Sequence, residues 1–221
     1  MMNEKKKKGP VECIISLFAR LVFFIWSLGT RILFLGKVIY KNKDVKKQMK
    51  GSCIYIANHT DHNDGFFVPH MLMGRKINVL VTTKWYNKKK YNWLFRNLSY
   101  IPIDLTTMDA QWMEIAKEKL KKGESILIFP EGIIERNGVM EPFQPGFLML
   151  ARHVDASIIP LAITDRYRAF HRQRLVVGEE IIFDVNKKGR LSTLLKEEAQ
   201  ICREQVAKLL EESNATNPYQ F

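Results

Sequence analysis

The side chains best suited to chemistry lie in one short run, residues 58–64 (NHTDHND), where His59 and Asp64 form an H-x4-D pair. A neutral imidazole accepts a proton from a hydroxyl group, and a carboxylate on its other ring nitrogen fixes the tautomer and stabilises the imidazolium. Residues five positions apart do not face each other on a regular helix, where neighbours lie three or four apart. The spacing therefore predicts a strand that turns into a helix, with His59 before the turn and Asp64 at the helix start.

The residues on either side of this run fit such a turn. Residues 53–57 (CIYIA) form a short apolar run typical of a strand. Residues 66–68 (FFV) form the apolar beginning of a helix for which Asp64 is a candidate cap.

Three interpretations of the run are open at this point. In the first, its histidines are ordinary loop residues and Asp64 is only a helix cap. In the second, imidazoles and carboxylates suited to zinc or another first-row metal bind an ion, from the set His59, Asp61, His62, Asp64 and His70. In the third, His59 and Asp64 are a general-base dyad for acyl transfer.

A second segment bears on this choice. Residues 125–129 (SILIF) are bounded by a turn and by Pro130, which predicts a buried parallel strand that stops there. Glu131 and Gly132 then lie at the carboxyl end of the strand. Ligands of open α/β sheets usually bind at that edge.

Together the two segments resemble motifs of the glycerolipid acyltransferase family, in particular of 1-acyl-sn-glycerol-3-phosphate acyltransferases. The resemblance extends from about Gly51 to Ile163 and keeps the family order of four blocks, which are residues 58–64, 100–104, 129–132 and 158–163. The first and third blocks are specific as a pair, whereas the second and fourth are little more than apolar strands with a proline.

The resemblance implies an α/β fold and an acyltransferase that needs no metal or redox cofactor. His59 would be the general base and Asp64 would hold its ring, while Glu131 and Gly132 would bind the acceptor substrate. The donor would be a fatty acyl thioester of acyl-carrier protein or coenzyme A. The acceptor would be a lysophospholipid, chiefly 1-acyl-glycerol-3-phosphate, which gives phosphatidic acid.

Three departures from the family pattern concern the acceptor. Ile133-Ile134 replaces a Thr-Arg pair whose guanidinium is thought to hold the acceptor phosphate, Leu105 replaces an arginine, and residues 143–146 (FQPG) lack a lysine. Each change removes a positive charge where a phosphate would bind. We expect Lys84 and Arg136 to supply phosphate contacts instead.

Two other functions remain as alternatives. A metal-dependent hydrolase would use His59, His62 and Asp64 as ligands, although the remaining imidazoles, His153 and His171, lie in no metal-spaced motif. A non-catalytic lipid-binding protein with this fold would bind a lysolipid without turning it over.

The formal net charge is +12, and much of the positive charge is clustered in the N-terminal part of the chain, at residues 5–8 and at six lysines between 37 and 50. Near an anionic membrane surface such residues contribute about 1 kcal/mol each. A nucleic-acid partner is not expected, since the sequence has no zinc-finger, RNP or helix-turn-helix signature.

An apolar stretch, residues 14–40, lies between these two basic clusters. Its longest charge-free piece, 21–30, is shorter than the ~18 apolar residues that a membrane span needs. Arg20 and Arg31 are eleven positions apart and so return to nearly the same helix face. We expect a helix lying in the bilayer interface on the cytoplasmic side, in preference to a single span or a core helix. Gly29 would allow this segment to bend into two helices.

The remaining sequence alternates strand and helix patterns, which predicts an α/β domain with a mixed, largely parallel central sheet flanked by helices. Three cysteines without metal spacing indicate reduced thiols. The expected organisation is an N-terminal membrane-anchoring helical segment (1–45), an α/β acyltransferase domain (46–213) and a loose tail (214–221). Strands are predicted at 77–81, 101–103, 125–129, 157–163, 174–177 and 181–183, and helices at 85–98, 109–122, 147–153 and 191–212.

Overall fold

The computed structural model describes residues 10–33, 36–98, 100–107, 110–134, 139–164, 170, 173–183 and 188–213. The predictions for the lysines at 5–8, for the helix start at residue 109, for Arg136 and for the tail after 213 lie outside these residues.

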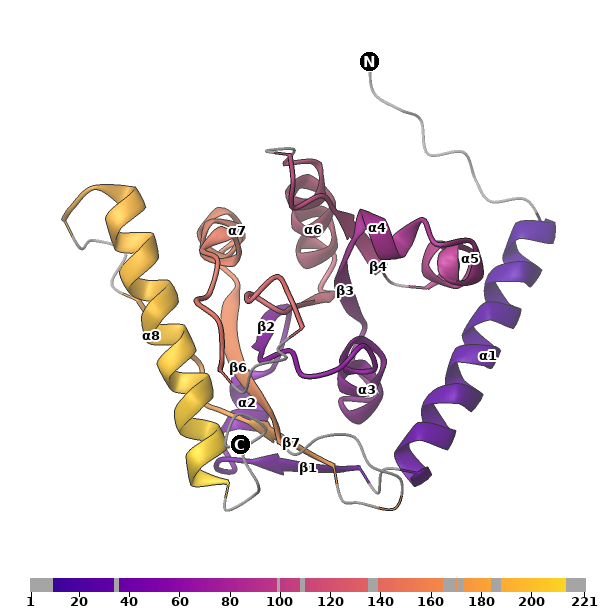
Figure 1. The fold of residues 1–221 in the computed structure, drawn as a ribbon, viewed down its shortest axis with the longest axis horizontal. Helices are drawn as coiled ribbons and strands as arrows, with labels where there is room; N and C mark the ends of the chain where they lie inside the picture. The colour runs from indigo at the N-terminus through magenta and orange to yellow at the C-terminus, as the bar shows by residue number, and fades with distance from the viewer. Residues whose placement is uncertain are drawn as a thin grey trace.

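A seven-stranded sheet in the order β1-β7-β6-β2-β5-β3-β4 forms the centre of the fold (Figure 1). Neighbouring strands pair in parallel except β6 and β7, which are antiparallel. This confirms the mixed, largely parallel sheet predicted from the sequence. The strands are β1 Lys37–Tyr40, β2 Cys53–Ala57, β3 Ile77–Thr82, β4 Tyr100–Ile103, β5 Ser125–Ile128, β6 Ser157–Thr164 and β7 Arg174–Val177.

Helices cover both faces of the sheet because the central strands are apolar on both sides. In β2, Ile54 and Ile56 pack in one core cluster, and Cys53, Tyr55 and Ala57 pack in another, as the two-residue period of a strand requires. The first cluster includes residues of three helices, α6 Gln111–Lys121, α7 Gly146–Val154 and α8 Leu191–Glu212. The second cluster includes residues of α2 Val45–Gln48 and α3 Asp64–Met71.

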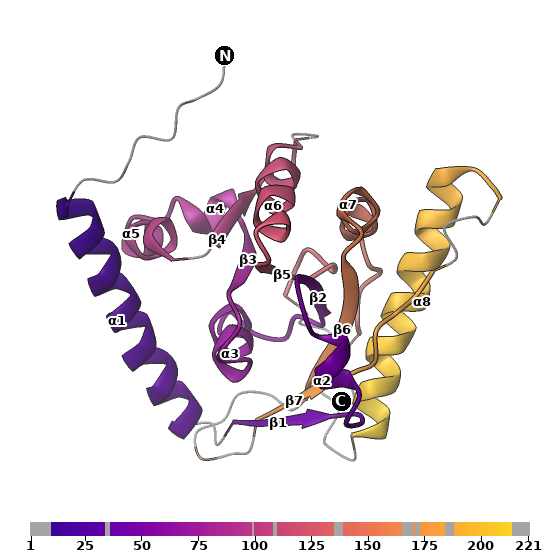
Figure 2. The same ribbon diagram turned by 180° about the vertical axis from the view of Figure 1, so that it is seen from behind.

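The first helix, α1 Pro10–Leu33, runs unbroken through Gly29, so the bend that this glycine would allow is not formed. A Cβ atom at Gly29 would meet nothing within 4 Å beyond its chain neighbours and the helix's own backbone, and a glycine inside a helix lowers its stability relative to alanine. Both views place α1 along the outer side of α3 and of α5 Lys89–Asn97 (Figure 2). Among the described helices, none combines the length and hydrophobicity needed to span a bilayer.

The N-terminal boundary of the sheet also differs from the prediction. β1 pairs with β7 over Lys37–Tyr40, so the sheet begins at Lys37 rather than after residue 45. The sequence does not reveal this strand, because residues 37–40 continue the apolar pattern of the preceding segment.

Three smaller differences concern element ends. The helix predicted at 85–98 is two helices, α4 Thr83–Tyr86 and α5, separated at Asn87 and Lys88. The helix expected from residue 109 begins at Gln111 after the N-cap Ala110. In place of the strand predicted at 181–183, Ile181 forms an isolated bridge with Ile158.

Candidate active site

The two motif segments meet at the carboxyl edge of the sheet. β2 and β5 are parallel neighbours with Ile56 opposite Ile128, so the residues that follow both strands lie on the same side. Residues 58–64 come after β2, and residues 129–132 come after β5. This is the edge at which the sequence predicted a ligand site.

His59 and Asp64 are in contact, as their spacing predicted. The Nδ1 atom of His59 lies 2.9 Å from Oδ2 of Asp64. The aspartate side chain is 0% exposed and that of the histidine is 19% exposed. Because a carboxylate accepts hydrogen bonds, this contact favours the proton on Nδ1 and leaves the lone pair of Nε2 available.

The Asp64 carboxylate is also bound to the main chain of the turn. Its Oδ2 accepts the N–H groups of Thr60 at 2.7 Å and Asp61 at 2.9 Å. Helix α3 begins at Asp64, but Asn63 is the N-cap and makes no side-chain capping bond. The predicted cap role of Asp64 is therefore wrong, because its oxygens face back toward His59 and the turn.

The imidazole of His59 also stacks on a neighbouring ring. Its centroid lies 4.2 Å from that of Phe129, with an interplanar angle of 18°. Phe129 is the residue after β5, so the end of β5 supports one face of the His59 ring.

Glu131 lies behind the histidine and is 5% exposed. Its Oε1 accepts the main-chain N–H of His59 at 2.8 Å, and its Oε2 accepts that of Glu141 at 2.9 Å. Its predicted contact with an acceptor substrate stays a prediction, since both of these bonds are to the main chain of the protein.

Gly132 closes the turn after β5. Its N–H donates to the carbonyl of Phe129 at 3.1 Å, and its φ of +72° lies in the left-handed region that favours glycine. That N–H is engaged in the turn, and the predicted contact of Gly132 with the acceptor substrate stays a prediction.

Two residues of the first and second motif blocks, for which the sequence predicted no individual role, hold the site in place. Asn58 is fully buried and donates from Nδ2 to the carbonyl of Ile163 at 3.0 Å. The hydroxyl of Tyr100 in β4 donates to the carbonyl of Gly65, in the first turn of α3, at 3.0 Å. Burial raises the pKa of Tyr100 well above its usual range, so this hydroxyl remains a donor.

The metal-ligand set is not brought together. Among the described residues, no group of three or more His, Cys, Asp or Glu side chains is arranged to hold an ion. The ring of His62 packs 4.5 Å from that of Trp85, and Oδ1 of Asp61 accepts the N–H and side-chain amide of Asn63.

Lys84 is exposed on α4. It lies beside the H-x4-D turn, since the ring of the next residue, Trp85, packs against that of His62. The ammonium of Lys88 lies 3.3 Å above the Trp85 ring. The turn therefore has a basic and aromatic flank, whereas Arg136, the other predicted phosphate contact, lies outside the described residues.

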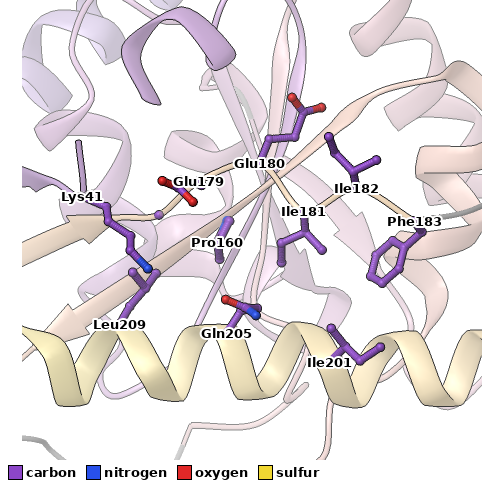
Figure 3. A pocket seen from close by; sticks show the side chains of 11 residues that line it. Lys41, Pro160, Glu179, Glu180, Ile181, Ile182, Phe183, Ile201, Gln205 and Leu209 are labelled. Atoms are coloured by element: carbon purple, nitrogen blue, oxygen red, sulfur yellow. The ribbon is translucent and has the colours of Figure 1, made fainter. Parts of the chain in front are cut away.

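A groove of about 330 Å³ lies elsewhere, between α8, the middle of β6 and the residues that follow β7 (Figure 3). Its floor includes Pro160, Ile181 and Leu209, and Lys41 on its rim pairs with Glu212 at 3.2 Å. None of the predicted site residues lines this groove.

The chain is similar to several known proteins. The sequence profile of a family described as Acyltransferase matches residues 37–164. A 1-acyl-sn-glycerol-3-phosphate acyltransferase of Cocos nucifera is 28% identical over 159 residues, which cover 69% of this chain and 47% of the relative. An enzyme of the same name from Limnanthes douglasii is 27% identical over 157 residues, covering 67% of this chain and 50% of the relative.

The chain spans about half the length of the curated relatives that it matches. Among solved structures, the 1-acyl-sn-glycerophosphate acyltransferase PlsC of Thermotoga maritima superposes with a TM-score of 0.57 and 20% identity. The superposition covers 93% of this chain and 81% of PlsC, which shows a common fold.

Proposed function

Because this chain belongs to the Acyltransferase family, whose profile covers more than half of it, we propose that it transfers a fatty acyl group from an acyl thioester to the free hydroxyl of a lysophospholipid. The observation that carries the proposal is the contact between His59 and the buried Asp64 at the carboxyl edge of the sheet.

The reaction is a direct transfer between two substrates. Nε2 of His59 takes the proton of the acceptor hydroxyl as its oxygen attacks the thioester carbonyl carbon. Asp64 stabilises the imidazolium through Nδ1. The tetrahedral intermediate then expels the thiolate, which takes the proton from the imidazolium, so that an ester and a thiol are formed. Main-chain N–H groups near Gly65 are candidate donors for the oxyanion.

For the acceptor we propose 1-acyl-glycerol-3-phosphate, in keeping with the names of the plant relatives. Its phosphate would contact Lys84 and Arg136, in place of the basic residues that this chain lacks. The donor would be acyl-coenzyme A or acyl-carrier protein, both of which are anionic and suit the exposed lysines 88–90 beside the site.

We place the reaction at an anionic membrane surface on its cytoplasmic side. α1 buries Ser16 and Ala19, and Phe23 packs against Phe66 of α3. Its other side exposes large apolar residues, among them Leu17, Phe18, Leu21, Phe24, Ile25 and Trp26. A helix with so much exposed apolar surface is stabilised by burial in the bilayer interface.

The test is a radiolabelled acyl-donor assay with vesicles and a panel of lysolipid acceptors, in which wild type is compared with His59→Ala. Loss of a general base lowers the rate by about 10²–10⁴-fold. Turnover that survives in His59→Ala would refute the base assignment. Lysolipid binding by wild type without any acyl transfer would favour the lipid-binding alternative.

A further inference from the structure

We propose that Glu131 is a positioning residue, which holds the main chain of His59 and makes no contact with the acceptor. This inference rests on the acyl-transfer function proposed above. It means that the third motif block supports the first block through a hydrogen bond between Glu131 and the main chain of His59.

Both oxygens of the Glu131 carboxylate accept a main-chain N–H. One oxygen accepts the N–H of His59 at 2.8 Å and the other accepts the N–H of Glu141 at 2.9 Å. The residue is 5% exposed, so each of these bonds is formed away from bulk water. A carboxylate accepts hydrogen bonds at both oxygens and therefore matches two main-chain donors at once.

The segment that carries the second donor, the N–H of Glu141, is hydrogen-bonded to α8. The Nε atom of Arg203 donates to the carbonyls of Met140 and Glu141 at 3.1 and 3.2 Å. The N–H of Gln144 donates to the carbonyl of Pro130 at 2.8 Å, which ties the same segment to the turn before Glu131. A continuous set of hydrogen bonds thus runs from Arg203 through Met140 and Glu141 to Glu131 and His59.

His59 is consequently fixed at two independent points. Asp64 holds its ring through Nδ1, and Glu131 holds its main chain. The first contact sets the tautomer and the second sets where the Cα atom sits relative to β5. A displacement of about 1 Å in a reacting group can cost about 10²-fold in rate.

The substitution Glu131→Gln tests this role. Glutamine has nearly the same shape as glutamate. Its NH₂ group, however, would face one of the two main-chain N–H donors and cannot accept a hydrogen bond from it. We expect kcat to fall by about 10–100-fold while KM for 1-acyl-glycerol-3-phosphate stays within about threefold. An acceptor contact predicts the reverse, a raised KM at nearly constant kcat, and that result would overturn the proposal.

Glu124→Gln is the matched control, because Glu124 is a buried glutamate at the opposite end of β5. Its oxygens accept from Lys76 and from Asn78, far along the strand from His59. Both variants should lower the melting temperature, whereas only Glu131→Gln should lower kcat. An equal loss of kcat in the control would mean that the effect is general destabilisation.

Amide hydrogen exchange gives a readout that does not depend on activity. The peptide that contains the N–H of His59 should exchange faster in Glu131→Gln than in wild type or Glu124→Gln, and unchanged exchange would overturn the proposal. If wild type transfers no acyl group, the proposed function fails, and the exchange result still decides the positioning role.

Should Glu131→Gln not fold, Arg203→Lys replaces it. Lysine presents one compact ammonium in place of a guanidinium whose Nε donates to both carbonyls. A kcat lowered about threefold or more at unchanged KM supports positioning through this segment. A kcat equal to that of wild type contradicts it.

Discussion

The side chain of Asn58 pairs with both main-chain polar groups of Ile163. Its Nδ2 donates to the carbonyl at 3.0 Å, and its Oδ1 accepts the N–H at 2.8 Å. Asn58 follows β2 and Ile163 lies in β6, so this pair links the two neighbouring strands at the residue just before His59. Asn58→Ala would leave a buried N–H and a buried C=O unpaired, each costing about 1–3 kcal/mol.

We therefore expect Asn58→Ala to lower the free energy of unfolding by about 2–5 kcal/mol in a denaturant titration. Asn97→Ala is its control, because the Asn97 amide bonds to the Trp93 carbonyl in an exposed position. Equal stability of the two variants would contradict the structural role of Asn58.

Asp64→Asn should remove most of the activity while leaving the fold intact. An amide in place of the carboxylate no longer stabilises the imidazolium, and the comparable change in a serine-protease triad costs about 10⁴-fold in kcat. We expect a loss of about 10³–10⁴-fold in steady-state assays. Asp61→Asn, in the same turn but bonded to Asn63, should retain most of the activity; similar losses in both would argue against a specific dyad.

Lys84→Ala should weaken binding of the acceptor phosphate. A hydrogen bond to a charged group contributes about 1.5–3 kcal/mol, which corresponds to about a 10–100-fold rise in acceptor KM with little change in kcat. Lys122→Ala, on the opposite edge of the sheet after α6, serves as the control. An unchanged KM in Lys84→Ala would remove Lys84 from the acceptor site.

The exposed face of α1 should carry membrane affinity. Leu17→Asp and Ile25→Asp each remove an exposed apolar side chain. Burial of such a side chain contributes about 1.5–3 kcal/mol, so each change should weaken vesicle binding at least about tenfold. Co-sedimentation with phosphatidylglycerol vesicles measures this, and Leu191→Asp on α8 should bind as wild type does. Wild-type binding by all three variants would exclude α1 as the anchor.

The cysteines give a prediction about pH. Burial and the nearby Glu198 raise the pKa of Cys202 to about 12, from 9.0 for the free side chain. The unfolded chain thus loses this proton first, so the contribution of Cys202 to stability is complete below about pH 9 and decreases between about pH 9 and 12. Burial also raises the pKa of Cys53.

Without lipid at pH 8, iodoacetamide should therefore modify the exposed Cys13 and spare Cys53 and Cys202 in the folded protein. Intact mass should show one adduct in the native chain and three after denaturation. Native modification at Cys202 would show that α8 opens readily.

The sequence predicted those parts of the site that depend on local spacing. A five-residue interval cannot align on a helix, so the turn between β2 and α3 followed from His59 and Asp64 alone, and Pro130 marked the end of β5. The contact between Glu131 and the main chain of His59 joins residues 72 positions apart in sequence and has no local signature. The same holds for Arg203, whose partners are the carbonyls of Met140 and Glu141.

Apolar and helical patterns misled the prediction where two elements share one pattern. Residues 37–40 continue the apolar composition of α1, yet they pair with β7 as a strand. Residues 85–98 keep an amphipathic helical spacing, yet the chain turns at Asn87 and Lys88 between α4 and α5. Tertiary packing decided both cases.

The packing of α1 on α3 has a consequence for where the reaction can occur. Phe23 of α1 touches Phe66, which lies two residues after Asp64 on α3. The helix that would rest on the lipid thus packs directly against the helix that begins with the acid of the dyad. The depth of α1 in the leaflet would then set the height of the His59 imidazole above the lipid surface. The hydroxyl of a lysolipid could reach His59 while the acyl tail of that lysolipid stays among the other lipids.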